Sequence, residues 1–216
     1  MKPPRAERVA IAGPAGPLEA LIEIPHEASE PPRACGVVCH PHPLFGGTLD
    51  NKVVWTVARA FEAFGAPAIR FNFRGVGASA GAYGEGRGET EDTLAVIDFA
   101  RRRWPQAALW LGGFSFGAAV AVRVAQAAQA ALLTAVAPGI TVVDVRAAAP
   151  PECPWLIVQG EADEVVPTAA VLEWARRLSP PPEISLLPGA SHFFHGRIND
   201  LRDVLVNFLT RTAQSP

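Results

Sequence analysis

Two periodicities of apolar residues alternate along this chain. Short, almost wholly apolar segments are separated by longer segments in which apolar residues recur with the spacing of a helix. The first pattern predicts strands buried on both faces, and the second predicts amphipathic helices. The predicted strands are 7–13, 18–25, 35–40, 66–73, 107–113, 131–138, 155–160 and 184–189, and the predicted helices are 50–65, 89–103, 116–126, 168–178 and 197–211.

Local signals set the ends of several of these elements. Asp50 precedes the first apolar residue of the helix 50–65 and can cap it, whereas Gly65 follows the last and can end it. A turn at 13–16, with a glycine at each end, separates the first two strands. This pattern predicts an antiparallel hairpin at the start of the chain.

The alternation of strands and helices predicts the fold class. Continuous apolar strands joined by helices are typical of a mostly parallel sheet covered on both faces. We therefore expect one α/β domain over residues 1–216, with about eight strands and helices on both faces of the sheet. Only residues 140–154 separate the segment AVAPG from the strand WLIVQG, which is too short a connection for a helical cap domain.

The composition argues against several classes of partner. Apolar residues make up 49% and charged residues 19%, as in a globular protein, and the formal net charge is −2. The longest basic run is Arg101–Arg103, so attraction to nucleic acid or to an anionic membrane is not expected. No apolar run approaches the length of about 18 residues that suggests a membrane span. We expect a soluble protein, and the sequence gives no indication of its oligomeric state.

The cysteines and the N-terminus point to a reducing compartment. Cys35 and Cys39 lie four residues apart on a predicted strand, so their Cα atoms are roughly 13 Å apart, too far for a disulfide. Cys153 is the third cysteine, and the first ten residues, MKPPRAERVA, lack the apolar segment of a signal peptide. A cytoplasmic protein with reduced thiols is expected.

The segment GGFSFG (112–117) carries the first chemical signal. It follows the predicted strand AALWL and precedes a helix, and it contains G-x-S-x-G with Ser115 at its centre. A nucleophile on such a sharp strand-to-helix turn needs small neighbours, which Gly113 and Gly117 supply. The alternative is an ordinary glycine–serine turn in which Ser115 caps the helix.

A serine hydroxyl needs a base, usually a histidine, to become a nucleophile. His192 follows the last predicted strand, from which it can reach the carboxyl edge of the sheet. His195 lies three residues further on and is the rival, with a place at the start of the last helix or in substrate binding as its other roles. His26 falls in an early polar loop and is expected to face solvent.

A carboxylate is needed to orient the base, and WLIVQGEADEVVP offers three. Asp163 is the preferred acid. Glu161 and Glu164 are longer and are expected to be solvated, and Asp144 is a weak alternative after another strand. The order Ser115, Asp163, His192 is the order of the triad in α/β-hydrolases.

The oxyanion of acyl transfer needs two N–H donors. The N–H of Phe116, at the start of the helix after Ser115, is the first. The second is expected from the segment 37–51, which joins a strand to a helix. Pro41 and Pro43 in it have no N–H, which leaves His42 or Leu44.

Two further motifs are candidates for cofactor sites, one for zinc and one for a nucleotide, and neither fits. His40 and His42 have a spacing that zinc can use, but no HExxH or cysteine pair supplies further ligands, so hydrogen bonding within the loop is favoured. The glycine-rich segment 74–89 lacks a P-loop pattern and misses the G-x-G-x-x-G spacing by one residue. A mobile surface loop at the rim of the site is expected there. We expect neither a metal nor an organic cofactor.

Five segments together carry a family resemblance: HPHPLFGGTLDNKVV, FNFRGVGASAG, GGFSFGAAVA, GEADEVVP and GASHFF. Over nearly its whole length the chain resembles small, lidless bacterial serine hydrolases of the α/β-hydrolase fold, related to dienelactone hydrolases and acyl-peptidase-like esterases. The resemblance implies Ser115 as nucleophile, Asp163 as acid and His192 as base. The chain departs from dienelactone hydrolases in having serine rather than cysteine as the nucleophile, and from many lipases in lacking an HGGG loop.

These observations predict a serine esterase that acts on small, soluble acyl esters through an acyl-enzyme. A peptidase, thioesterase or acyltransferase would use the same residues. The non-catalytic alternative is a binding protein of the same fold, which usually lacks a member of the triad.

Overall fold

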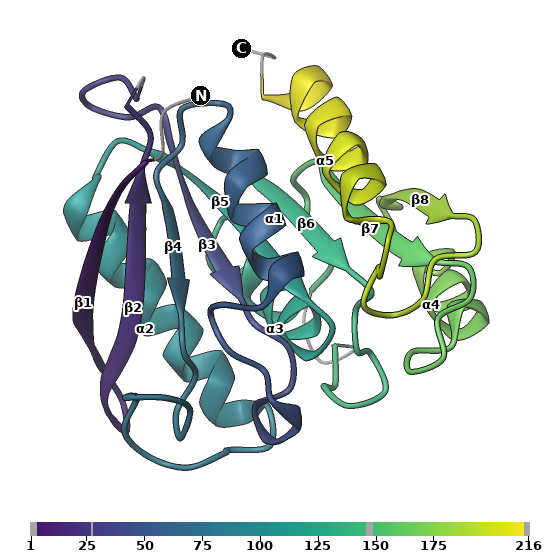
Figure 1. The fold of residues 1–216 in the computed structure, drawn as a ribbon, viewed down its shortest axis with the longest axis horizontal. Helices are drawn as coiled ribbons and strands as arrows, with labels where there is room; N and C mark the ends of the chain where they lie inside the picture. The colour runs from purple at the N-terminus through teal and green to yellow at the C-terminus, as the bar shows by residue number, and fades with distance from the viewer. Residues whose placement is uncertain (1–3, 27, 146–148, 214–216) are drawn as a thin grey trace.

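The computed structural model of the chain describes residues 4–26, 28–145 and 149–213 and has a twisted sheet at its centre (Figure 1). The strands are β1 (Arg5–Gly13), β2 (Gly16–Ile24), β3 (Ala34–Cys39), β4 (Ala68–Phe71), β5 (Ala108–Phe114), β6 (Leu132–Val136), β7 (Trp155–Gly160) and β8 (Glu183–Leu187). The helices are η1, a short 3-10 helix (Pro43–Phe45), α1 (Lys52–Glu62), α2 (Arg87–Arg103), α3 (Phe116–Ala125), α4 (Thr168–Ala175) and α5 (Ile198–Thr212).

All eight strands belong to one sheet, in the order β1-β2-β4-β3-β5-β6-β7-β8. β1 pairs with β2, and β2 with β4, in antiparallel fashion, and every other pair is parallel. The predicted hairpin and the mostly parallel sheet of eight strands are confirmed. Because β3 and β5 to β8 run in one direction, the loops that follow them lie at the same edge of the sheet.

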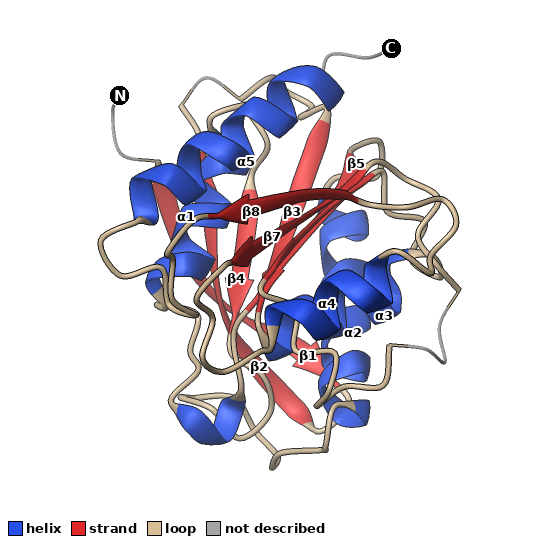
Figure 2. Ribbon diagram, turned by 90° about the vertical axis from the view of Figure 1, so that its right-hand side faces the viewer, coloured by secondary structure: helices blue, strands red, loops and turns tan. Residues whose placement is uncertain are grey.

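Helices cover both faces of the sheet, as predicted. α1 and α5 contact each other on one face, and α2, α3 and α4 lie on the other (Figure 2). The described part of the connection between β6 and β7 contains no helix, so no cap covers the carboxyl edge of the sheet there. This edge is therefore left to the loops that carry the candidate functional residues.

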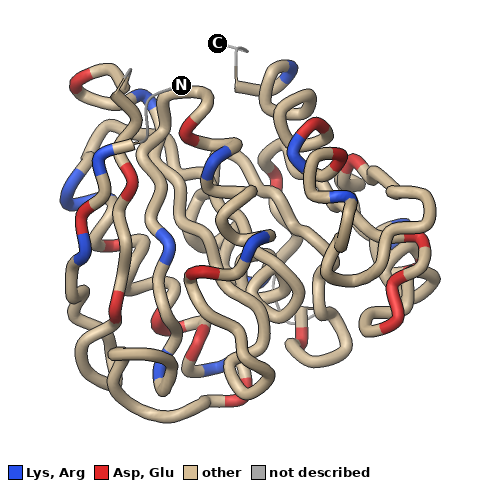
Figure 3. Tube along the Cα trace, in the orientation of Figure 1, with Lys and Arg blue, Asp and Glu red and all other residues tan. Residues whose placement is uncertain are grey.

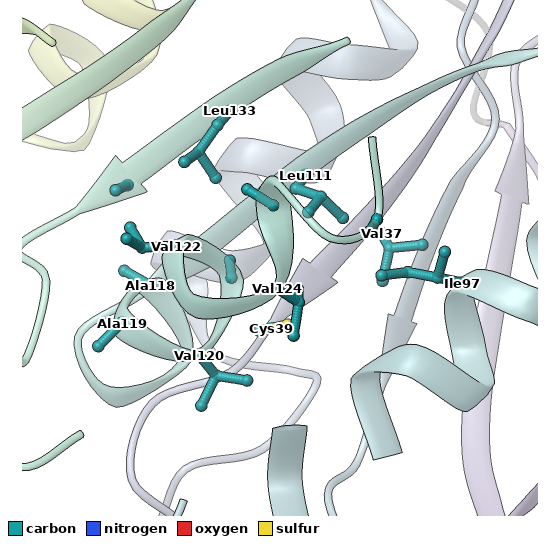
Figure 4. Close-up of a cluster of buried hydrophobic side chains, with 14 of the residues drawn as sticks. Val37, Cys39, Ile97, Leu111, Ala118, Ala119, Val120, Val122, Val124 and Leu133 are labelled. Carbon is teal, nitrogen blue, oxygen red and sulfur yellow. The ribbon is translucent and has the colours of Figure 1, made fainter. Parts of the chain in front are cut away.

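Small side chains let α3 approach the sheet closely. Ala118 and Val122 of α3 lie in one buried cluster with Val37 of β3 and Leu111 of β5 (Figure 4). Ile97 of α2 belongs to the same cluster. Burial of these side chains stabilises the fold by about 25 cal/mol for each Å² of apolar surface removed from water. The packing also fixes the N-terminus of α3, where Ser115 precedes the helix.

The cap of α1 differs from the prediction. Asn51, not Asp50, is the N-cap, and its Oδ1 accepts hydrogen bonds from the N–H groups of Val53 (2.9 Å) and Val54 (3.4 Å). Asp50 is instead exposed, and its carboxylate lies 3.6 Å from the guanidinium of Arg70. Both residue types are good N-caps, so the sequence alone did not distinguish two adjacent candidates.

Basic and acidic residues are interspersed along the trace of the chain (Figure 3). This distribution agrees with the small formal net charge of −2. None of the helices in the described part of the chain combines the length and the hydrophobicity that crossing a bilayer requires.

A buried acidic group lies between α1 and the antiparallel part of the sheet. The side chain of Glu62 is 1% exposed and forms an ion pair with Arg59. Glu23 and Arg70 form a second, buried ion pair (2.9 Å) nearby. Burial, together with the charge of Glu23, raises the pKa of Glu62 to about 7. One carboxylate oxygen of Glu62 has no hydrogen-bond partner among the described residues, so the ionised form is poorly stabilised.

Glu62→Gln is expected to stabilise the protein at high pH relative to low pH. The pKa of this acid is raised in the folded state, so its ionisation destabilises the fold progressively between about pH 4.5 and pH 7. Glutamine removes that dependence. The free energy of unfolding of the variant, minus that of the wild type, should be about 2–3 kcal/mol more positive at pH 8 than at pH 5.

Urea unfolding at the two pH values measures this difference. Glu173→Gln is the matched control, because Glu173 is exposed and pairs with Arg177 on the surface of α4. For this control, the free energy of unfolding relative to the wild type should change by no more than about 0.5 kcal/mol between the two pH values. If the stabilities of the two variants depended on pH in the same way, the pKa of Glu62 would not be raised in the folded protein.

Candidate active site

The turn between β5 and α3 holds Ser115 in a strained conformation. Ser115 has φ 55° and ψ −118°, in a region that residues other than glycine rarely occupy. A Cβ atom on Gly113 would lie 2.5 Å from the carbonyl oxygen of Gly117, and one on Gly117 would lie 2.3 Å from that of His40. Glycine is therefore required on both sides of the serine. Strain of this kind is typical of a nucleophile elbow and is not needed for a simple helix cap.

A continuous hydrogen-bond chain runs from this serine to an acid. Ser115 Oγ lies 3.0 Å from His192 Nε2, and His192 Nδ1 lies 2.8 Å from Asp163 Oδ2. The three residues come from the loops after β5, β8 and β7 respectively. The side chain of His192 is 2% exposed and that of Asp163 is 0% exposed. The structure thus brings together the three residues that the sequence analysis selected.

The carboxylate of Asp163 is held by several donors. Its Oδ1 accepts hydrogen bonds from the backbone N–H groups of Val165 (2.9 Å) and Val166 (2.7 Å). Its Oδ2 accepts one from the side-chain amide of Gln159 (2.9 Å) as well as the one from His192. Burial by itself would raise the pKa of Asp163, but the hydrogen bonds from His192, Val166 and Val165 outweigh it and lower the pKa. An ionised Asp163 accepts the Nδ1–H of His192, so in the neutral imidazole the Nε2 lone pair faces Ser115.

Gln159 and Glu164 support the site and were missed by the sequence analysis. Gln159 lies on β7, fully buried, and contacts Asp163, while Glu164 Oε2 accepts the backbone N–H of His192 (3.1 Å). Glu164 is exposed, as expected, but its contact with His192 was not predicted. The signal for Gln159 was present, since it is the one polar side chain in the apolar run WLIVQG. The position of Glu164 depends on how two loops meet, which local sequence does not encode.

The rejected alternatives lie outside the hydrogen-bond chain. His195 is exposed, with its ring 5.9 Å from that of Phe193, and His26 is exposed as predicted. Glu161 is exposed and accepts the N–H of Gly189. Asp144 lines an open cavity beside α4, which neither Ser115 nor His192 lines.

The loop after β3 packs against the serine turn. His40 is fully buried, with its Nδ1 2.6 Å from the carbonyl oxygen of Pro41 and its Nε2 accepting the N–H of Phe73 (3.0 Å). Burial lowers the pKa of His40 to about 4, so the ring is neutral and serves as a structural bridge. Gly47 allows the loop to turn, because a Cβ atom there would lie 2.1 Å from the oxygen of Pro41.

Within the same loop, His42 caps the short helix η1. Its Nδ1 accepts the backbone N–H of Leu44 (3.2 Å), and its Nε2 lies 3.2 Å from the hydroxyl of Tyr83. Burial lowers the pKa of His42, although the charge of Glu89 opposes the effect. The ring nitrogens of both loop histidines are thus engaged by protein groups. Among the described residues, no group of three or more His, Cys, Asp or Glu side chains is placed to hold a metal ion.

The glycine-rich segment 74–89 reaches this site through Tyr83. The carboxylate of Glu89 accepts the N–H groups of Gly84 (2.8 Å) and Gly86 (2.7 Å), and Asp92 accepts the N–H of Arg74 (3.0 Å). Glu89 and Asp92 are fully buried. These buried carboxylates anchor the loop at both ends, and the predicted mobility of the part between them stays a prediction.

Large apolar side chains surround the site on several loops. Phe45 is 84% exposed and its ring lies 4.6 Å from that of His42, while Phe193 is 43% exposed and its ring lies 5.0 Å from that of His192. Leu44 is also exposed, and so is Val165, whose N–H is bound to Asp163. The arrangement offers a nucleophile with its base and an apolar rim that a substrate could contact.

Comparison with known proteins places the chain in a family. Residues 32–151, more than half of the chain, match the family described as serine aminopeptidase, S33. An α/β serine hydrolase homologue from Coxiella burnetii is 45% identical, with a TM-score of 0.89, over 94% of this chain and 97% of that one. An α/β serine hydrolase without a lid from Xanthomonas campestris is 38% identical, with a TM-score of 0.91, over 100% of this chain and 99% of that one.

A more distant likeness extends to an esterase from Butyrivibrio proteoclasticus, whose structure contains ferulic acid. It is 18% identical, with a TM-score of 0.82, over 96% of this chain and 100% of that one, and so shows the shared fold alone. The lidless α/β-hydrolase fold predicted from the sequence is confirmed by these likenesses and by the sheet. The chain belongs to the serine aminopeptidase S33 family of α/β serine hydrolases.

Proposed function

We propose that this protein cleaves carboxylic esters of small, soluble acyl substrates through an acyl-enzyme on Ser115. The observation that carries the proposal is the hydrogen-bond chain from Ser115 through His192 to Asp163, built on a strained turn. A binding protein of this fold has no need of a strained serine hydrogen-bonded to a buried histidine. This hydrogen-bond arrangement therefore favours catalysis over the non-catalytic alternative.

The geometry supports a two-step mechanism. As Ser115 Oγ attacks the acyl carbon, His192 Nε2 takes its proton, and the carboxylate of Asp163 stabilises the resulting imidazolium. When the tetrahedral intermediate collapses, the imidazolium gives that proton to the leaving alcohol. A water molecule then attacks the acyl-enzyme, its proton passes to His192 Nε2, and the same proton returns to Ser115 Oγ as the acid product leaves.

Two backbone N–H groups are proposed to bind the oxyanion. Phe116 is the first residue of α3, so its N–H has no acceptor within the helix and lies at the positive end of the helix dipole. For the second donor we favour His42 over Leu44. The N–H of Leu44 is already bound to the side chain of His42, whereas the N–H of His42 donates to no acceptor in the described part of the chain.

The substrate class follows from the open edge of the sheet. With no helix in the described connection between β6 and β7, the acyl group has no cap above it, which favours short acyl chains over long lipids. The exposed side chains of Phe45 and Phe193 give an apolar surface for such a group. Cys35, Cys39 and Cys153 are free thiols, which fits the cytoplasmic location that we propose.

A fluorophosphonate probe tests the proposal without knowledge of the substrate. Such probes phosphonylate only a serine that is activated as a nucleophile, so one adduct is expected on the wild type by intact mass and none on Ser115→Ala. Chelation of metals should not change the result. Absence of an adduct on folded wild type would overturn the serine mechanism and promote the binding-protein alternative.

The family description favours a second candidate, cleavage of peptide bonds at a free N-terminus. The same three residues would serve it. Hydrolysis of matched aminoacyl p-nitroanilides and p-nitrophenyl esters of the same amino acids separates the two. Efficient cleavage of the esters alone would support the esterase, and comparable cleavage of the anilides would support the peptidase.

A further inference from the structure

Tyr83 contacts the site from a loop to which the mechanism assigns no role. It is the only tyrosine in the chain, and its hydroxyl lies 3.2 Å from His42 Nε2, although the two residues are 41 positions apart. Its ring lies 5.0 Å from that of His42 and 6.0 Å from that of Phe116, the residue after the nucleophile. Tyr83 is thus adjacent to both residues proposed to supply oxyanion donors.

The direction of each hydrogen bond on His42 follows from its partners. The backbone N–H of Leu44 can only donate, so Nδ1 of His42 must carry a lone pair. An imidazole with a lone pair on Nδ1 carries its single proton on Nε2. Nε2–H therefore donates to the hydroxyl oxygen of Tyr83, and the tyrosine acts as the acceptor that fixes the tautomer.

The hydroxyl of Tyr83 is held in place by its neighbours in the chain. Gly84 and Gly86, just after it, are bound through their N–H groups to the buried carboxylate of Glu89. The Cβ atom that a larger residue would carry at Gly84 would lie 2.9 Å from the Cα atom of Gly88, so the loop closes tightly onto the start of α2. An acceptor fixed in this way can select one orientation and one tautomer of the imidazole.

We propose that Tyr83 is a positioning residue for the oxyanion site, and that it acts through the side chain of His42. The relay runs from the Tyr83 hydroxyl to His42 Nε2, and from His42 Nδ1 to the N–H of Leu44. It holds the helix η1 in the form that engages Leu44 and leaves the N–H of His42 for the substrate. The inference rests on the proposed function, because it assumes an oxyanion formed at Ser115.

Tyr83→Phe keeps the ring and removes only the acceptor. We expect kcat/KM for p-nitrophenyl acetate and the rate of phosphonylation of Ser115 to fall about 5- to 20-fold, since one hydrogen bond that supports the transition state is lost. The loss should lie in kcat, with KM within about twofold of the wild-type value. Nitrogen-15 NMR of the histidines should show a changed His42 and an unchanged His40.

A second substitution separates positioning from direct contact with the substrate. His42→Asn supplies a side-chain acceptor for Leu44 N–H that needs no help from Tyr83, as Asn51 does for Val53 at the start of α1. In this background, Tyr83→Phe should change kcat/KM by less than about twofold. The same 5- to 20-fold loss in both backgrounds would overturn the relay, and so would unchanged kinetics of Tyr83→Phe alone.

The outcomes also distinguish this inference from the proposed function. A wild type that forms no fluorophosphonate adduct contradicts the serine mechanism itself. A wild type that forms the adduct at the same rate as Tyr83→Phe leaves the mechanism intact and contradicts the role of Tyr83.

Discussion

Replacing Ser115 with alanine is expected to lower kcat for ester hydrolysis by roughly 10⁴- to 10⁶-fold. The substitution removes the atom that we propose forms the acyl-enzyme, and His192 Nε2 then has no hydroxyl to deprotonate at 3.0 Å. The variant should fold, because alanine keeps the Cβ atom and therefore adds no strain at the φ of 55° that serine already adopts. Hydrolysis of p-nitrophenyl acetate measures the loss, with circular dichroism as the check on folding.

Ser185→Ala is the matched control for this experiment. Ser185 lies on β8, away from the hydrogen-bond chain, and its substitution should leave kcat within about twofold of the wild type. If Ser115→Ala retained more than about a tenth of wild-type activity, hydrolysis would have to proceed without an acyl-enzyme at this residue.

Asp163→Asn is expected to lower kcat by about 10³- to 10⁴-fold while the protein stays folded. Asn Oδ1 is fixed by the two backbone donors, Val165 and Val166, so the amide nitrogen must face His192. An N–H group there forces the proton of the neutral imidazole onto Nε2, where it blocks acceptance of the serine proton. The effect follows from the wrong tautomer and not from loss of structure.

The groups around Asp163 can accommodate the side-chain amide of the asparagine variant. The Oε1 atom of Gln159 has no hydrogen-bond partner among the described residues, so a flipped Gln159 side chain can accept the new N–H group. The flip gives up only the long hydrogen bond from Gln159 Nε2 to the carbonyl oxygen of Val166 (3.3 Å). The free energy of unfolding should therefore change by no more than about 1 kcal/mol at pH 7. Asp203→Asn, on the exposed face of α5, is the control. Activity of Asp163→Asn within tenfold of the wild type would remove Asp163 from the mechanism.

Much of the fold could be predicted because it depends on local patterns. Each predicted strand and helix corresponds to an observed element, with ends that differ by a few residues. The sharpest prediction concerned β7, where the apolar run WLIVQG is bounded by a proline and a charged loop. The prediction of the N-cap of α1 was wrong because Asp50 and Asn51 have nearly equal preferences for that position. The backbone conformation in the folded protein makes Asn51 the cap.

The sequence by itself determined the sheet, its helices and the position of Ser115, because periodicity and backbone strain are properties of short segments. Tertiary structure decided which polar groups meet. Ser115 and His192 are 77 residues apart, and the contacts of Asp163 with Gln159 and of His42 with Tyr83 depend on how separate loops pack at one edge of the sheet. Hydrogen bonds act over about 3 Å and only in suitable directions, so their partners are fixed by the assembled fold and not by residue type.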